Sequence, residues 1–249
     1  MTTDHYNQPE LANLYDDENV WDASADFYLD LAERGGAKTL LDLGCGTGTV
    51  TRGIIAAIGG SGVGVDPAQP MLDVASRKTR DEKVEWVRGD AREIRLGRSF
   101  DLIIMTGHAF QGFLTEADQV ALFRTVAAHL TPDGRFAFDS RNPAARQWLE
   151  WVPGRSNRVV ETVAYGAVEI WNEATMNPDK ILDVVEHYRF LSSGQRLRSD
   201  FRLRFCAPEE LWDGMMAAGL AVEHCYGSWD RRPFTPDQRE IIIVARSAA

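Results

Sequence analysis

Three glycines at alternate positions, Gly44, Gly46 and Gly48, follow a short apolar run at residues 40–43. The next apolar residues, between positions 50 and 58, recur at helical spacing, so the glycines fall in a turn between a buried strand and a helix. Because glycine lacks a Cβ atom, such a turn lets a ligand lie against backbone N–H groups near the start of the helix. The pattern favours a nucleotide-like cofactor, and a purely structural use of the glycines is the alternative.

A carboxylate, Asp66, stands at the end of the next short apolar run. At the carboxyl end of the second strand of an α/β unit, an acid can accept hydrogen bonds from both hydroxyls of a ribose that lies across the first two strands. Asp66 could instead cap the helix that begins near Ala68. We expect the ligand role, because the acid follows the glycine turn at a suitable distance along the chain.

Alternating strands and helices must hold these groups in place. Strand-like apolar runs recur along the first part of the chain, at residues 40–43, 63–67, 84–88, 100–105 and 135–139. Segments with helical spacing separate several of them, at residues 50–58, 71–75 and 114–130. This alternation predicts an α/β fold with a parallel sheet and helices on both faces, because each crossover must be right-handed and about one helix long.

The rhythm changes on either side of this region. Before it, apolar residues between positions 11 and 31 predict two short helices that end at Gly35 and Gly36. After Asn142, alternating runs predict an antiparallel meander, at residues 158–164, 167–175, 181–191 and 195–206. A helix at 208–218 and strands at 220–226 and 240–245 follow.

These changes of rhythm divide the chain into four parts. We expect N-terminal lid helices at 1–36, a cofactor-binding core at 37–142, an antiparallel β insertion that covers the substrate at 143–207, and the end of the core sheet at 208–249. Simple packing of the first two helices on the sheet is the alternative to a lid.

The composition disfavours nucleic acid as a partner. The chain has 249 residues, of which 44% are hydrophobic, and a formal net charge of −10, which repels a phosphate backbone unless a local basic surface offsets it. Four arginines do alternate along one strand-like run, at Arg196, Arg198, Arg202 and Arg204. We expect them on a solvated strand face, and a binding patch is the alternative.

The cysteines and the hydropathy pattern narrow the class further. Cys45, Cys206 and Cys225 are far apart and show neither a CxxC pair nor zinc-ligand spacing, so we expect no disulfide framework and no structural zinc. The first thirty residues lack the pattern of a secretory signal, and no stretch approaches the ~18 apolar residues that cross a membrane. We therefore expect a cytoplasmic protein, monomeric or homodimeric, that does not bind membranes.

Four segments in order complete a specific pattern: LDLGCGTG at 41–48, GVD at 64–66, GDA at 89–91 and FDLI at 100–103. With them the chain resembles the class I S-adenosylmethionine-dependent methyltransferases over nearly its whole length. The resemblance implies a Rossmann-like, doubly wound, seven-stranded and mostly parallel sheet, with its last strand reversed beside the sixth and the insertion between strands five and six. It also implies methyl transfer from S-adenosylmethionine to oxygen or nitrogen of a small molecule, as in amino-sugar N-methyltransferases and natural-product O-methyltransferases.

The resemblance also implies roles for individual residues. The glycine loop would cradle the methionine part of the cofactor, Asp66 would hold the ribose, and Asp90 would bind the adenine amino group. Around the cofactor it places Tyr15, Trp21, Gly44, Cys45, Gly46, Gly48, Asp66, Pro67, Met71, Asp90, Ala91 and Thr106.

A nicotinamide-dependent oxidoreductase is the main competitor within this architecture. Its G-x-G-x-x-G turn would need a glycine at position 49, where this chain has Thr49. We therefore favour the methyltransferase. A methyltransferase of tRNA or protein and a non-catalytic cofactor-binding scaffold are further alternatives.

Methyl transfer from a sulfonium needs few catalytic groups, because most of the catalysis can come from holding the nucleophile in line with the methyl group. A hydroxyl or a protonated amine also needs a base, and His108, just past the fourth strand, is the best placed candidate. The alternative is that His108 only hydrogen-bonds the backbone or stacks on the cofactor. Arg141, after the fifth strand, could hold a substrate carboxylate.

No metal site is expected. Magnesium-dependent catechol methyltransferases place an acid at the end of strand four, where this chain has Thr106, Gly107 and His108. Aromatic residues in the parts that would roof the site favour an apolar, ring-accepting pocket; they are Tyr6, Tyr15, Trp21, Phe110, Phe113, Trp148, Trp151, Tyr165, Trp171 and Trp229.

Overall fold

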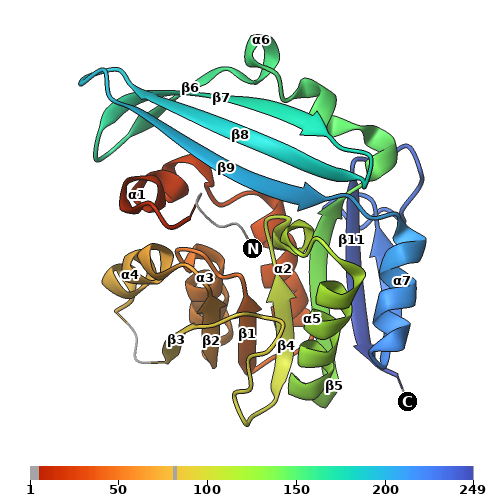
Figure 1. Cartoon of the computed structure of the whole chain (residues 1–249). Coiled ribbons are helices and arrows are strands. Elements are labelled where there is room, and N and C mark those ends of the chain that lie inside the picture. Colours follow the sequence, from red (N-terminus) through yellow and green to blue (C-terminus); the bar gives the residue numbers. More distant parts are fainter. Residues whose placement is uncertain (1–5, 81–82, 249) are drawn as a thin grey trace.

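The computed structural model describes residues 6–80 and 83–248. Within them, seven strands form one sheet in the order β10-β11-β5-β4-β1-β2-β3, and four strands form a second sheet in the order β6-β7-β8-β9. Figure 1 shows the second sheet above the first, with α1 (Pro9–Glu18) between them.

The larger sheet is mostly parallel. Its strands are β1 (Thr39–Leu43), β2 (Ser61–Asp66), β3 (Val84–Arg88), β4 (Phe100–Met105), β5 (Leu130–Arg141), β10 (Leu220–Tyr226) and β11 (Glu240–Ser247). β1 pairs in parallel with β2 and β4, whereas β11 runs antiparallel between β5 and β10. The α/β class, the parallel core and the reversed last strand confirm the fold expected from the sequence.

Helices cover both faces of this sheet. α5 (Glu116–His129) and α7 (Pro208–Ala217) pack on the face that contains Leu41, while α2 (Ala23–Arg34) and α3 (Thr49–Ile58) pack on the face that contains Leu40. Both leucines are fully buried, so β1 is covered on both sides, as its largely apolar run predicts. α4 (Gln69–Lys78) follows β2 and contacts α1.

The smaller sheet is an antiparallel meander. It consists of β6 (Arg158–Thr162), β7 (Gly166–Met176), β8 (Ile181–Phe190) and β9 (Arg196–Arg204), each paired antiparallel with the next. Short helical turns lead into it: η2 (Pro143–Ala145), η3 (Gln147–Glu150) and α6 (Pro153–Ser156). Val168 and Tyr188 on its inner face pack against Leu11 and Leu14 of α1, so this helix joins the meander to the rest of the molecule.

The two N-terminal helices have different roles. α2 begins after Asp22, whose carboxylate accepts hydrogen bonds from the N–H groups of Ser24 and Ala25. Its Phe27 and Tyr28 are buried in the sheet core, as in the packing alternative to a lid. Of the two helices, α1 is therefore the one that lies beside the insertion.

Two boundaries differ from those expected. β5 begins at Leu130 rather than near residue 135, because Leu130 pairs with Phe100 and Arg135 pairs with Leu102, so that the intervening residues bulge from the ladder. α5 begins at Glu116 because the Thr115 hydroxyl accepts a hydrogen bond from the N–H of Asp118. The residues before it form η1 (Ala109–Gly112).

The alternating arginines of β9 are interleaved with acids. Arg198 forms an ion pair with Asp200, and Arg204 lies 3.4 Å from both Glu116 and Glu210. Leu197 and Leu203 pack on the apolar side of the meander, as expected, but the side chain of Arg204 is only 15% exposed, so the arginine row is not solvated along its whole length. None of the described helices combines the length and the apolarity that crossing a membrane requires.

Candidate active site

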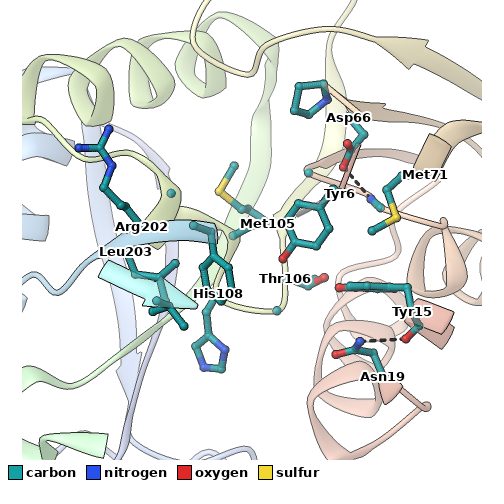
Figure 2. A pocket seen from close by; sticks show the side chains of 18 of the residues that line it. Tyr6, Tyr15, Asn19, Asp66, Met71, Met105, Thr106, His108, Arg202 and Leu203 are labelled. Atoms are coloured by element: carbon teal, nitrogen blue, oxygen red, sulfur yellow. Dashed lines mark hydrogen bonds between the residues drawn. The ribbon is translucent and has the colours of Figure 1, made fainter. Parts of the chain in front are cut away.

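A cavity of about 410 Å³ lies between the carboxyl ends of β1, β2 and β4 and the inner face of the meander. In open α/β sheets, ligands bind at these strand ends. Ten of the residues proposed from the sequence line it: Tyr15, Gly44, Gly46, Asp66, Pro67, Met71, Asp90, Ala91, Thr106 and His108. Figure 2 shows Asp66 and Met71 on one side of this cavity and His108, Arg202 and Leu203 on the other.

The glycine turn is held against the second strand. The N–H groups of Gly44 and Cys45 donate to the Val65 carbonyl oxygen at 2.8 and 3.1 Å. Gly44, Gly46 and Gly48 all have positive φ values, between 54° and 77°, which side chains with a Cβ rarely adopt. The turn therefore presents bare backbone to the cavity at Gly44 and Gly46.

Asp66 performs a structural task at the same place. One of its carboxylate oxygens accepts a hydrogen bond from Gly46 N–H at 2.9 Å, and the other accepts one from Ala68 N–H at 2.8 Å. Asp66 is only 7% exposed, and burial raises the pKa of its carboxyl against the lowering effect of the two N–H donors. The carboxylate thus fixes the glycine loop and the approach to α4 while it lines the cavity.

Two tyrosines form a wall over the glycine loop. A Cβ atom placed on Gly46 would lie 3.7 Å from the Tyr15 ring, and one on Gly107 would lie 3.9 Å from the Tyr15 hydroxyl. Tyr6 meets Tyr15 edge to face, with ring centroids 6.0 Å apart, and Figure 2 shows both hydroxyls directed toward Thr106. Burial raises the pKa of both tyrosines, so their hydroxyls stay neutral donors.

α1 connects the two ends of the cavity. Its Asp16 accepts a hydrogen bond from the Thr47 hydroxyl in the glycine turn and forms an ion pair with Lys78 of α4. Its Glu18 lies 2.8 Å from Arg158 of the meander. A displacement of α1 would therefore disturb the glycine turn and the meander together.

Three residues that the resemblance assigns to the cofactor do not line this cavity. Trp21 packs against Gly53 of α3 and donates its indole N–H to Asp26. Gly48 lies beneath the Trp86 ring, and Cys45 directs its sulfur toward Gly64. These three positions support the scaffold around the turn.

Asp90 is already engaged by a cation. Arg92 donates to both carboxylate oxygens of Asp90, at 3.0 and 2.6 Å, and also reaches Asp118 at 2.6 Å. The side-chain hydrogen bonds from Arg92 hold the pKa of Asp90 below its usual value. Asp90 therefore stays ionised and can accept further hydrogen bonds at the cavity wall.

His108 is held between two carboxylates. Its backbone N–H donates to Asp139 at 2.7 Å, and its Nε2 lies 2.8 Å from Glu240 and 3.6 Å from Asp139. Asp139 also accepts a hydrogen bond from the Tyr28 hydroxyl at 2.5 Å. The backbone of His108 is left-handed, with φ of 59°, a conformation that residues other than glycine adopt uncommonly.

Arg141 and the aromatic residues complete the walls. The Arg141 guanidinium lines the cavity, donates to the Gln111 amide oxygen at 2.8 Å and lies 5.0 Å from the Trp151 ring centroid. Of the aromatic residues expected to roof the site, Tyr6, Tyr15, Phe113 and Trp151 line the cavity. The others pack elsewhere: Trp21 on Gly53, Phe110 in the sheet core, Trp148 on Phe205, Tyr165 on Phe190, Trp171 on His187 and Trp229 on Phe27.

Sequence reasoning missed several charged and polar residues on the roof of the cavity. Glu18, Arg158, Glu186 and Tyr188 all line it, and so does Arg202, which was expected on a solvated strand face. The sequence does contain one signal for Glu186. Positions 182, 184, 186, 188 and 190 lie on the same face of β8, and the other four residues are apolar or aromatic, so an acid at position 186 stands out on a buried face. Among the residues that the structure describes, no group of three or more His, Cys, Asp or Glu side chains is arranged to hold a metal ion.

Comparison with known proteins decides the family. A model for a methyltransferase domain matches residues 40–134. The cypemycin N-terminal methyltransferase of a Streptomyces species is 30% identical over 214 residues, which cover 83% of this chain and 82% of that protein. The chain belongs to the S-adenosylmethionine-dependent methyltransferases.

Solved structures share the whole fold of this methyltransferase. An S-adenosylmethionine-dependent methyltransferase from Clostridium acetobutylicum superposes with a TM-score of 0.80 at 20% identity, covering 96% of this chain and 98% of that one. The sugar N-methyltransferase KedS8 from a Streptoalloteichus species gives a TM-score of 0.73 at 21% identity, covering 94% and 92%. S-adenosylmethionine is therefore the methyl donor of this enzyme, and the nicotinamide-dependent alternative is not favoured.

Proposed function

We propose that this methyltransferase transfers the methyl group to nitrogen or oxygen of a small molecule bound between the two sheets. The observation that carries this proposal is the single cavity that reaches from the glycine turn to the inner face of the meander, beside α1. A cavity of about 410 Å³ suits a small acceptor, and the acidic chain disfavours nucleic acid. Two similar proteins, the cypemycin N-terminal methyltransferase and the sugar N-methyltransferase KedS8, favour nitrogen over oxygen.

The residues around the glycine turn fit the donor. Gly44 and Gly46 leave room beside the backbone for its methionine part, Asp66 offers carboxylate oxygens for ribose hydroxyls, and Asp90 offers them for an adenine amino group. Pro67, Met71, Ala91 and Thr106 complete this end of the cavity. When bound, the donor supplies an activated methyl group on a sulfonium.

The protein itself positions the reacting groups and excludes water from them. Tyr6 and Tyr15 cover the glycine loop, and α1 acts as a lid that keeps water from the reacting atoms. The lid role falls to α1, because α2 packs in the sheet core. Residues 37–142 hold the donor and residues 143–207 cover the acceptor, while the segment 208–249 completes the sheet.

His108 is the proposed general base for an acceptor that must lose a proton. If Nε2 carries the hydrogen that Glu240 accepts, Nδ1 keeps a lone pair for the incoming proton. Glu240 would then fix the tautomer, as the orienting carboxylate of a catalytic triad does. A monomeric or homodimeric state and a cytoplasmic location stay predictions from the sequence.

The proposal is tested by incubating the protein with S-adenosylmethionine labelled in its methyl group and with separate pools of small metabolites, transfer RNA and protein. We expect the label in the small-molecule pool. Label that accumulates mainly in RNA or protein would contradict the proposal. His108→Gln in the same assay reports on the base, because a neutral amine acceptor would need none.

A further inference from the structure

One wall of the cavity contains two buried carboxylates that have no role in the methyl transfer described above. Glu18 of α1 and Glu186 of β8 line the cavity, with side chains only 11% and 10% exposed. Arg158 lies 2.8 Å from Glu18 and 3.2 Å from Glu186, but its own side chain is 42% exposed. Two shielded carboxylates thus share one guanidinium that is partly in solvent.

Beside these two carboxylates lies a buried hydrogen-bond acceptor that has no donor among the described residues. The Tyr188 hydroxyl donates to Glu186 at 2.7 Å. Asn172 stands opposite Glu186 in the register of β7 and β8, lines the same cavity, and has a buried Oδ1 that accepts no hydrogen bond from the described residues. A buried acceptor without a donor costs free energy, so a ligand that brings N–H donors and positive charge would complete this wall.

We propose that Glu18, Glu186 and Asn172 recognise the ammonium group of the acceptor, so that the substrate of this enzyme is a protonated amine. The inference rests on the proposed function and narrows its acceptor class. An ammonium group has three N–H donors in a compact head, and this wall presents three side chains that can accept them. Alcohols carry no charge to offset the two carboxylates.

For an ammonium acceptor, Glu18 of this wall would take the place that His108 has for a hydroxyl and accept the proton that must leave before the nitrogen reacts. In that step an N–H bond breaks, its electron pair stays on the nitrogen as the nucleophilic lone pair, and an O–H bond forms on Glu18. Burial and the neighbouring Glu186 raise the pKa of Glu18 to about 7, against the lowering effect of Arg158. Glu18 is therefore partly ionised near neutral pH, as suits a group that accepts and releases a proton.

Other charged or titratable groups also face Glu18. Asp17 on its own helix raises its pKa slightly further, and Glu18 in turn raises the pKa of Tyr6 and Tyr188. Asp17 thus adds to the negative charge near this wall, and both tyrosine hydroxyls stay protonated. Amine binding should therefore strengthen as the pH rises from about 6 to about 8, because the bound cation favours ionised Glu18.

The test uses the protein saturated with S-adenosylhomocysteine and three probes that share one ring: benzylamine, benzyl alcohol and benzoate. Calorimetry should show benzylamine binding at least about tenfold more tightly than benzyl alcohol. Glu186→Gln and, separately, Glu18→Gln should remove this preference. The exposed Glu161 of β6 is the matched control, and Glu161→Gln should leave the preference intact.

The outcomes distinguish failure of the proposed amine site from failure of the proposed function. Normal S-adenosylhomocysteine binding with no preference for the amine, or with preference retained in both variants, would overturn the amine site. Preference for benzoate would also overturn it and would point to Arg141 as the group that selects the substrate. Failure of the wild-type protein to bind S-adenosylhomocysteine would instead overturn the proposed function.

Discussion

Asp66 is the residue where loop structure and donor binding meet, because its carboxylate holds Gly46 and Ala68 and also lines the cavity. Asp66→Ala should weaken binding of S-adenosylmethionine by roughly 1 to 3 kcal/mol, since a buried charge-assisted hydrogen bond is lost. Isothermal titration calorimetry measures this directly. Asp73→Ala on the exposed side of α4 is the control, and equal affinities for the two variants would refute the ribose role.

Asp42 gives the stability of the chain a pH dependence. Burial raises the pKa of this carboxyl to about 7, although the Thr51 hydroxyl donates to it at 2.6 Å, and its other oxygen has no hydrogen-bond partner among the described residues. The folded chain therefore keeps a proton that the unfolded chain releases above about pH 4. The stability from this proton is complete below about pH 4 and is lost as the pH rises through about 7.

Asp42→Asn should accordingly become more stable relative to the wild type as the pH rises from about 5 to about 8. The gain is at most about 1.4 kcal/mol for each pH unit, because one group titrates. Urea unfolding of both proteins at several pH values checks it. Stability curves that run parallel over this range would show that Asp42 does not retain the proton.

At the scale of elements, the turn from β1 into α3 depends on a glycine that a side chain cannot replace. Gly48 has φ of 71°, and a Cβ atom there would lie 2.1 Å from the Trp86 ring. Gly59, at the other end of α3, has φ of 62° with nothing within 4 Å of such an atom. The two positions therefore share backbone strain and differ in steric conflict.

Gly48→Ala should cost at least about 1 kcal/mol more free energy of unfolding than Gly59→Ala, because it adds overpacking to the same strain. Denaturant unfolding of both variants measures the difference. Trp86→Leu combined with Gly48→Ala should recover part of it, since the conflict is with this ring. Equal costs at the two glycines would mean that Trp86 moves freely.

The helix α1 is the element on which closure of the cavity depends. Removing residues 1–20 would leave α2 and its buried Phe27 in place but would remove Tyr15 and Glu18 from the cavity and the contact of Asp16 with the glycine turn. We expect turnover to fall at least about tenfold while the remaining chain still unfolds cooperatively. Comparison of methyl-transfer rates with thermal melts separates the two effects, and an unchanged rate would refute the lid.

Across the whole molecule, the succession of strands and helices along the chain was predictable because local patterns determine it, whereas the reversed last strand was implied by the family resemblance. Largely apolar runs such as 100–105 mark doubly covered strands, and glycines mark the turns between them. The four strands of the meander were likewise visible as alternating runs. The glycine turn, Asp66 and His108 each follow a parallel strand. Because the carboxyl ends of parallel strands meet at one edge of the sheet, the sequence also predicted that these residues lie close together.

What the sequence could not reveal are contacts between distant segments. The link of Asp16 to Thr47, and that of Glu18 to Arg158 and Glu186, depend on how α1 settles between the two sheets. The same limit applies to Trp21, whose position next to Gly53 reflects the packing of α2 on α3. The local spacing of residue types does not predict which distant segments contact one another in the fold.

The central claim is that one cavity, covered by α1, binds the donor at the glycine turn. Hydrogen–deuterium exchange with and without S-adenosylhomocysteine tests it most directly, because protection is read segment by segment. We predict slower exchange at residues 44–48, at 66–71 and along α1 when the ligand is bound. Binding that leaves these three segments unchanged and protects another part of the chain would contradict the account.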